Sequence, residues 1–116
     1  MYKKGERAVF RGEHAAGGAG HILREPLISD EERAPYCGMF NRNVLEEGCE
    51  VGWHQHVGDG EAYYILQGKG IYNDNGTEIP VEAGDSMWCK DGDWHSLVNT
   101  EKEDLVFIAL ILKSGE

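Results

Sequence analysis

The sequence predicts an all-β fold that forms a single sandwich or barrel domain. Short segments of strand-forming residues recur about every 8–12 residues, with turn residues between them. The 116 residues include 16 glycines, and no stretch has the periodicity of a long helix. A chain of this length forms one domain around one hydrophobic core.

The first 35 residues are predicted to form an N-terminal arm, ahead of a barrel over residues 36–116. The arm contains a short strand at 8–10, a flexible loop at 15–20 and a longer strand at 21–28. Pro26 places that longer strand at a sheet edge, because proline cannot donate to a central ladder. Edge strands invite pairing, so the arm is a candidate for docking on a second copy. A helix-cap start at Ser29 is cut off at Pro35, which leaves at most one helical turn.

From residue 36 onward, strands alternate with turns. Strands are expected at 36–45, through 54–56, and at 61–66, 70–72, 77–82, 86–89, 94–99 and 105–112. Asn75-Gly76 is a strong hairpin signal, because both turn residues must adopt positive φ. In the strand that follows it, Ile79 and Val81 are expected to point inward. The last strand is apolar on both faces, which predicts a position buried in a double-layered structure.

Composition excludes several classes of protein. The net charge of −10 argues against binding to nucleic acid or an anionic membrane, since both need a basic face. The longest apolar run has eight residues, too few to cross a bilayer, and no apolar run follows the first lysines as in a signal peptide. Three cysteines without CxxC spacing predict reduced thiols, so the chain is interpreted as a soluble cytoplasmic protein.

The segment His54-Gln55-His56 is the strongest candidate for chemistry. Residues two apart on a strand share a face, so both imidazoles can reach one ion. Glu61 lies at an odd offset and would face the other way, unless Gly58 and Gly60 turn the backbone before it. Two imidazoles and a carboxylate form a divalent-metal site that lacks a ligand or two. His95, on a later strand that a barrel brings opposite, is the natural fourth ligand.

Two stretches of the chain resemble the paired motifs of the cupin superfamily, G-x5-H-x-H-x4-E-x6-G and G-x5-P-x-G-x2-H-x3-N. The chain fills nine of the ten motif positions at the same spacing, with Gly48, His54, His56, Glu61 and Gly68 in the first motif and Gly84, Gly92, His95 and Asn99 in the second. Lys90 stands where the family usually has proline, which affects the expected shape of that loop but not the ligand set.

The resemblance implies a conical β-barrel, or jelly roll, of two antiparallel sheets with a metal inside. It implies that His54, His56, Glu61 and His95 hold this metal, and that the chain forms a homodimer in which the N-terminal strands add to the partner's sheet. Three neutral imidazoles and one carboxylate would leave a net +1 charge on a divalent ion and, in an octahedral site, two open positions. Mn(II) or Fe(II) are favoured, and Ni(II), Zn(II), Co(II) and Cu(II) are alternatives.

Three functions are compatible with a barrel that holds such a metal site. The first, which we favour, is a metal-dependent enzyme that acts on a small oxygenated or carboxylate substrate, as a dioxygenase, decarboxylase, isomerase or lyase. Tyr63 is its candidate acid, because this residue lies on the same strand face as Glu61. The second is a non-catalytic module that binds or senses a metal and a small ligand. The third, a storage protein, is disfavoured by the intact ligand set.

Other polar and aromatic residues receive simpler interpretations. Asn99 is expected to make a structural hydrogen bond, and Cys89 to be a small core residue. Arg42, ahead of the first motif, could meet a carboxylate at the barrel mouth. Trp53, Trp88 and Trp94 are expected at the core or the rim, and His14 and His21 at the surface or an interface.

Overall fold

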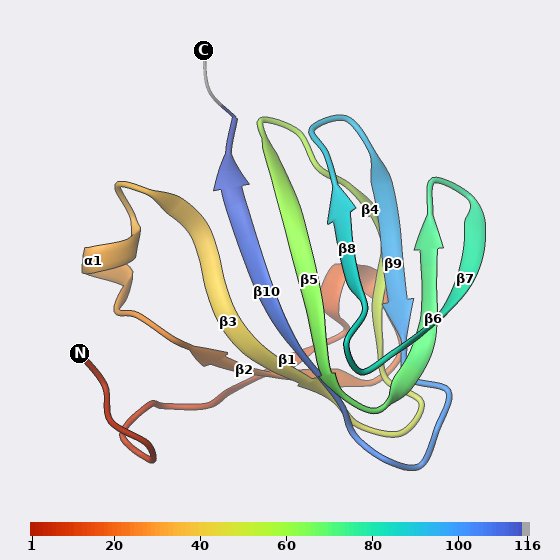
Figure 1. Ribbon diagram of the computed structural model, residues 1–116, viewed down its shortest axis with the longest axis horizontal. Helices are drawn as coiled ribbons and strands as arrows, with labels where there is room; N and C mark the ends of the chain where they lie inside the picture. Colours follow the sequence, from red (N-terminus) through yellow and green to blue (C-terminus); the bar gives the residue numbers. More distant parts are fainter. Residues whose placement is uncertain (115–116) are drawn as a thin grey trace.

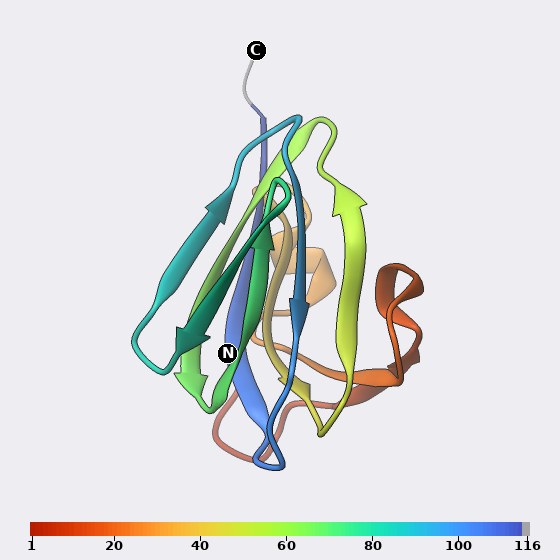
Figure 2. The same ribbon diagram turned by 90° about the vertical axis from the view of Figure 1, so that its right-hand side faces the viewer.

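Two antiparallel β-sheets face each other in this computed structural model, which describes residues 1–114 (Figures 1 and 2). The six-stranded sheet has the order β1 (Phe10–Glu13), β2 (His21–Pro26), β3 (Cys37–Leu45), β10 (Leu105–Lys113), β5 (Asp59–Gln67) and β8 (Ser86–Cys89). The four-stranded sheet has the order β4 (Glu50–Gln55), β9 (Trp94–Val98), β6 (Lys69–Asp74) and β7 (Thr77–Glu82). The predicted all-β barrel is confirmed.

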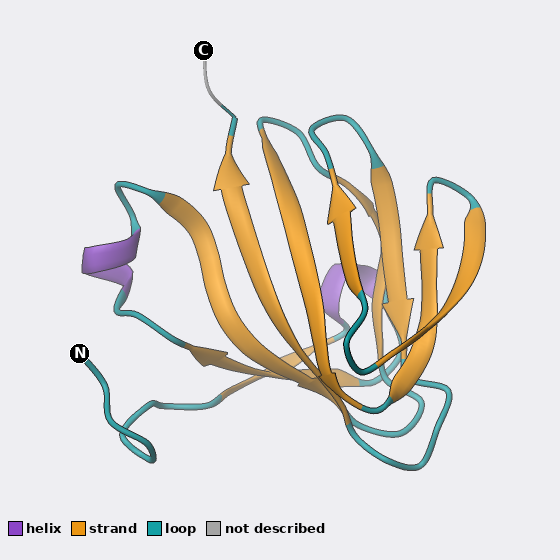
Figure 3. Ribbon diagram, in the orientation of Figure 1, coloured by secondary structure: helices purple, strands orange, loops and turns teal. Residues whose placement is uncertain are grey.

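Helical structure is confined to two short segments among the described residues (Figure 3). They are the 3₁₀ turn η1 (Ala15–Gly17) and the single α-helical turn α1 (Asp30–Arg33). Ser29 caps α1 by accepting a hydrogen bond from the Glu32 backbone N–H, as its sequence position predicts. No helix within residues 1–114 has the length and apolar character needed to cross a membrane.

The hydrophobic core lies between the two sheets, with β10 at the centre of the larger one. β10 pairs with β3 on one side and β5 on the other, which explains why its first residues are apolar on both faces. The most completely buried apolar side chains come from strands of both sheets: Phe107, Ile65, Leu45, Leu97 and Leu105.

The β6–β7 hairpin turns as its sequence predicts. Asn75 and Gly76 have φ values of 51° and 101°, the left-handed conformation that a two-residue hairpin turn requires. Of the two residues expected to point inward on β7, Val81 is buried but Ile79 is 40 % exposed. The prediction for Ile79 is wrong because β7 is an edge strand, and this residue opens onto a surface groove shared with Trp88.

The N-terminal strands differ from their predicted placement. β2 is an inner strand, because it pairs with β3 through its second half and with β1 through its first half. The edge position belongs to β1, and Pro26 is tolerated because it is the last residue of β2. The arm therefore continues the large sheet.

The three tryptophans lie at the surface. Trp53, Trp88 and Trp94 are 46 %, 52 % and 39 % exposed, and Trp53 stacks on Trp94 with ring centroids 5.6 Å apart. Strand alternation turns them away from the interior, because their neighbours His54, Cys89 and His95 point toward it.

Candidate metal centre

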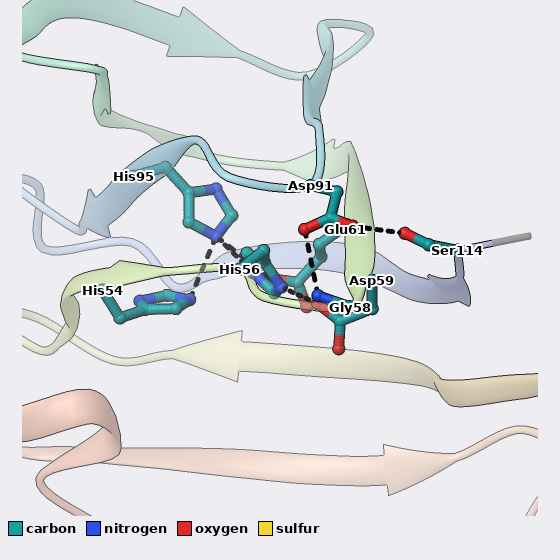
Figure 4. A network of polar contacts seen from close by, with 8 residues as sticks. All are labelled: His54, His56, Gly58, Asp59, Glu61, Asp91, His95 and Ser114. Atoms are coloured by element: carbon teal, nitrogen blue, oxygen red, sulfur yellow. Dashed lines mark hydrogen bonds and ion pairs between the residues drawn. The ribbon is translucent and has the colours of Figure 1, made fainter. Parts of the chain in front are cut away.

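Four side chains from both sheets converge inside the barrel (Figure 4). His54 is on β4 and His95 is directly opposite it on β9, while His56 follows β4 and Glu61 is on β5. The backbone turns at Gly58, whose φ is 82°, and this turn lets Glu61 face the two histidines. Gly60 has no positive φ; it lies within β5, where a Cβ would overlap the Trp88 ring.

The ligand atoms of the four side chains lie within 4.8 Å of one another. The Nε2 atom of His95 is 3.0 Å from that of His56 and 3.1 Å from that of His54. The Glu61 Oε1 atom is 3.2 Å from Nε2 of His56 and from Nε2 of His95. Three of the four residues are almost fully buried, and His54 is half-buried.

The outer nitrogen of each imidazole has a partner of its own. His54 Nδ1–H donates to the Gly52 carbonyl at 2.6 Å, and His56 Nδ1–H donates to Asp59 Oδ1 at 2.7 Å. His95 Nδ1 lies 2.9 Å from the Tyr72 hydroxyl. Such partners fix the tautomer and orientation of metal-binding histidines. In the neutral rings of His54 and His56, the Nε2 lone pair is therefore directed into the cluster.

Burial and the neighbouring charges set the protonation of the cluster. Burial lowers the pKa of His54, which keeps this ring neutral near pH 7. A hydrogen bond with Glu61 raises the pKa of His56, and Asp59 adds to this effect. Burial acts to raise the pKa of Glu61, but hydrogen bonds from His56 and His95 outweigh it and lower that pKa to about 2. Glu61 is thus a carboxylate at neutral pH.

The donor set fits a divalent cation. A divalent cation among these atoms would be bound by the Nε2 lone pairs of the three imidazoles and by the negative charge of Glu61. Neighbouring ligands of an octahedral ion with bonds of about 2.1 Å are about 3.0 Å apart, close to the spacing of these atoms. Three nitrogens and one oxygen suit a first-row transition metal and do not select one metal over another. His54, His56, Glu61 and His95 could therefore hold such an ion.

A cavity of about 200 Å³ is lined by three of the four candidate ligands, His54, His56 and Glu61. The other lining residues include Ala15 and Ala16 of η1, Ile22 and Arg24 of β2, and Met39 and Asn43 of β3. A larger groove of about 490 Å³ lies on the surface between β7 and β8, but it contains none of the four ligands. The smaller cavity is therefore the one beside the candidate metal ligands, and the N-terminal arm builds part of its wall.

A network of hydrogen bonds holds the loop that carries His56 (Figure 4). Gly58 N–H donates to Asp91 Oδ1 at 2.9 Å, and the Ser114 hydroxyl donates to Asp91 Oδ2 at 2.7 Å. The Ser114 N–H also donates to the Gly58 carbonyl at 3.0 Å. These bonds tie the β4–β5 and β8–β9 loops to the end of β10.

The turn at Lys90 forms without the proline of the family motif. The Asp93 N–H donates to the Lys90 carbonyl at 2.9 Å, and Gly92 has a φ of 92°. The Gly92 N–H then donates to the His56 carbonyl at 2.7 Å. Glycine and hydrogen bonds therefore shape this loop, and it still contacts the backbone of a ligand residue.

The structure accounts for the remaining candidates. Asn99 is fully buried and donates to the carbonyls of Leu45 and Glu103, which confirms its structural role. Cys89 is buried opposite Glu61, and burial raises the pKa of its thiol to about 11. Tyr63 lines the cavity and stacks on His95 with centroids 5.1 Å apart. Burial raises the pKa of Tyr63 well above its usual value, so its hydroxyl stays protonated.

The arginine expected near the site is a different one. Arg42 forms an ion pair with Glu25 and does not line the cavity, so its expected position at the barrel mouth is wrong. Asn43, the next residue along β3, faces inward instead, and Arg24 lies opposite it on β2. Strand alternation predicts that Arg42 and Asn43 face opposite ways, but only the pairing of β2 with β3 brings Arg24 to the cavity.

His14 and His21 lie away from the cluster. His14 Nδ1 donates to the Gly18 carbonyl at 3.1 Å within the η1 turn. His21 Nε2 lies 2.5 Å from Glu46 Oε1. Both residues therefore help to fasten the N-terminal arm.

Comparisons of the sequence and of the structure with known proteins agree on the relatives of this chain. Residues 42–111 match the model of the cupin domain. The chain is 41 % identical over 96 residues to the oxalate-binding protein of Thermotoga maritima, covering 83 % of this chain and 79 % of that protein. A crystal structure from T. maritima, described as a predicted oxalate decarboxylase, has a TM-score of 0.92 at 36 % identity and covers 98 % of this chain and 99 % of that chain.

A more distant solved structure shows the fold alone. It is a cupin 2 conserved barrel domain protein from Rhodopseudomonas palustris, with a TM-score of 0.76 at 20 % identity. The match covers 100 % of this chain and 80 % of that one.

Proposed function

The chain belongs to the cupin domain family, and from this membership we propose that it binds a small carboxylate of the oxalate class at a divalent metal ion. His54, His56, Glu61 and His95 would hold the ion. The observation that carries this proposal is the convergence of three imidazole nitrogens and one carboxylate beside a cavity of about 200 Å³. The names of the T. maritima relatives support oxalate as the ligand class.

Charge and size both favour a small anion. The four ligands would leave a net +1 charge on a divalent ion, and a carboxylate can neutralise it. The cavity is smaller than the pockets of about 300–1,000 Å³ that hold drug-sized ligands. When bound, a divalent ion supplies a Lewis acid that takes up carboxylate oxygens and stabilises negative charge on them. We favour Mn(II) or Fe(II), with Ni(II), Zn(II), Co(II) and Cu(II) as alternatives.

We propose binding as the primary function and an enzymatic reaction, such as decarboxylation, as the second candidate. Apart from the metal ligands, the cavity lining within residues 1–114 contains no carboxylate and no imidazole to act as a base. The observation that favours catalysis is the position of Tyr63 in the cavity wall, where its hydroxyl could donate a hydrogen bond to the substrate. Tyr63→Phe should abolish turnover of oxalate, but preserve its binding, if the enzymatic candidate is correct.

The test combines elemental analysis with calorimetry. Protein purified without chelator should contain close to one equivalent of metal per chain, and the double variant His54→Ala/His95→Ala should contain almost none. Oxalate should bind to the metal-loaded protein and fail to bind after chelation. Equal oxalate binding with and without metal, or unchanged metal content in the double variant, would contradict the proposal.

We also propose a homodimer that forms through the N-terminal strands, and a cytoplasmic location. β1 is an edge strand, and Phe10 on it is 58 % exposed, which supports pairing with a second copy. The three cysteines are buried and free, as in proteins of a reducing compartment.

A further inference from the structure

A second polar group faces the cavity from the large sheet. Arg24 on β2 and Asn43 on β3 are directly opposite each other in the antiparallel register, so their side chains share one face. Both line the cavity that the metal ligands line. Neither residue belongs to the motifs that mark the metal site.

Asn43 has an unsatisfied polar atom. The residue is 3 % exposed, and its Oδ1 has no hydrogen-bond partner within the part of the chain that the structure describes. Buried side-chain polar atoms nearly always have a partner, so an unpaired one indicates a missing ligand or water. Rotation of the amide by 180° exchanges oxygen and nitrogen, so Asn43 can present an acceptor or a donor to that ligand.

Arg24 differs from the other arginines. Arg7, Arg11, Arg33 and Arg42 each form an ion pair with a carboxylate, whereas Arg24 forms none among residues 1–114. Its guanidinium lies over Gly12 of β1, where a Cβ would overlap the Arg24 Nη1 atom. The missing side chain at Gly12 therefore provides the space that the guanidinium occupies, and the positive charge remains available to a ligand.

The cavity wall thus has a second positive pole, the Arg24 guanidinium, in addition to the proposed metal. The rest of the cavity lining is mainly apolar and includes Ala16, Ile22, Met39 and Ile111. A guanidinium binds a carboxylate through two parallel hydrogen bonds, which gives both affinity and orientation. A ligand with one carboxylate at the metal and another at the guanidinium satisfies both poles.

We propose that Arg24 and Asn43 form the second recognition site for a short dicarboxylate and select it over monocarboxylates. This inference rests on the proposed function for the metal-bound end of the ligand. Arg24 binds the distal carboxylate, and Asn43 donates an amide hydrogen bond to the same group. They are specificity residues of the N-terminal half, contributed by two strands that hold no metal ligand.

The test compares a dicarboxylate probe with a monocarboxylate probe. Calorimetry of the metal-loaded protein measures the affinities for oxalate and acetate. Arg24→Gln should weaken oxalate binding about 10- to 100-fold and acetate binding by less than about threefold. Metal content should stay at the wild-type level. Arg42→Gln is the matched control, because Arg42 lies on the same sheet but outside the cavity, and it should leave both affinities unchanged.

A second variant moves the guanidinium without removing its charge. Gly12→Ala should displace the Arg24 side chain and weaken oxalate binding in the same direction, and its φ is compatible with alanine. Thermal unfolding checks that both variants are folded. Wild-type oxalate affinity in Arg24→Gln, or an equal loss of oxalate and acetate binding, overturns the proposal. If the metal-loaded wild-type protein binds no oxalate, the proposed function itself fails. If the wild type binds oxalate and Arg24→Gln binds it equally well, only this inference fails.

Discussion

Each ligand histidine presents Nε2 to the cluster because a partner engages its Nδ1 atom. The three partners differ in kind: a backbone carbonyl for His54, a carboxylate for His56 and a phenol for His95. Removal of such a partner typically weakens metal binding about 10- to 100-fold. We therefore expect the affinity of this group for a metal to depend on residues outside the ligand set.

Tyr72 offers the simplest test of that dependence. Tyr72→Phe removes only the hydroxyl that contacts His95 Nδ1, so we expect Mn(II) affinity to fall about 10-fold. Tyr64→Phe is the control, because Tyr64 is exposed and strand alternation turns it to the opposite face of β5 from Glu61. Equal Mn(II) affinity for both variants in a chelator-competition titration would show that the hydroxyl does not support the site.

The lowered pKa of Glu61 predicts that the stability of the metal-free protein depends on pH. The folded-state pKa of this residue is lowered from 4.5 to about 2, so its contribution is complete above about pH 4.5 and is lost as the pH falls toward 2. The contribution is at most about 3 kcal/mol in the free energy of unfolding. Urea unfolding should show that wild type loses stability relative to Glu61→Gln over this acid range. Parallel stability curves for the two proteins would refute this expectation.

At the scale of elements, the β4–β5 turn brings His56 and Glu61 together inside the barrel. β4 ends before His56, Gly58 reverses the chain, and β5 begins at Asp59. Hydrogen bonds from the loop to Asp91 and Ser114 hold the turn against the other end of the chain. The geometry of the site is thus set by loops that are far apart in sequence.

Asp91→Asn should loosen this turn. The amide offers one acceptor where the carboxylate offers two, so we expect faster exchange of the Gly58 amide hydrogen and a several-fold loss of metal affinity. Asp104→Asn is the matched control, since Asp104 is exposed in a loop that contacts no metal ligand. Hydrogen exchange measured by NMR compares the two variants, and protection of Gly58 that is the same in both would contradict the role of Asp91.

At the scale of the whole molecule, both sheets and the N-terminal arm enclose one cavity. The four-stranded sheet contributes His54 and His95, and the six-stranded sheet contributes Glu61, Arg24 and Asn43. The two motifs that contain the candidate metal ligands span residues 48–68 and 84–99, whereas part of the cavity wall comes from the first 24 residues. Loss of the arm is therefore expected to alter ligand selection without removing a metal ligand.

The proposed dimer is tested at this scale. If β1 pairs with a second copy, light scattering on a size-exclusion column should give twice the mass of one chain. Phe10→Asp should shift the protein toward the monomer, because it places a charge on the exposed edge strand. Tyr36→Asp is a control at another exposed aromatic residue. A wild-type monomer, or equal dissociation by both variants, would contradict this interface.

Local patterns in the sequence determined the strands, the turns and the donor set. The Asn75-Gly76 turn and the apolar β10 were predictable, because backbone conformation and burial follow from short-range patterns. His54, His56, Glu61 and His95 could be grouped because motif spacing, strand parity and a glycine turn all act over a few residues. The cupin resemblance was visible in the same two stretches.

Only the tertiary structure shows which residues of β2 and β3 line the cavity beside the candidate metal ligands. Strand alternation could show that Arg42 and Asn43 point in opposite directions, but not which of them faces the cavity. Arg24 reaches the cavity because β2 pairs with β3 in one register, and a shift of one residue would turn it to the other face. The physical reason is that long-range strand pairing depends on the packing of the whole barrel, which no local segment of sequence contains.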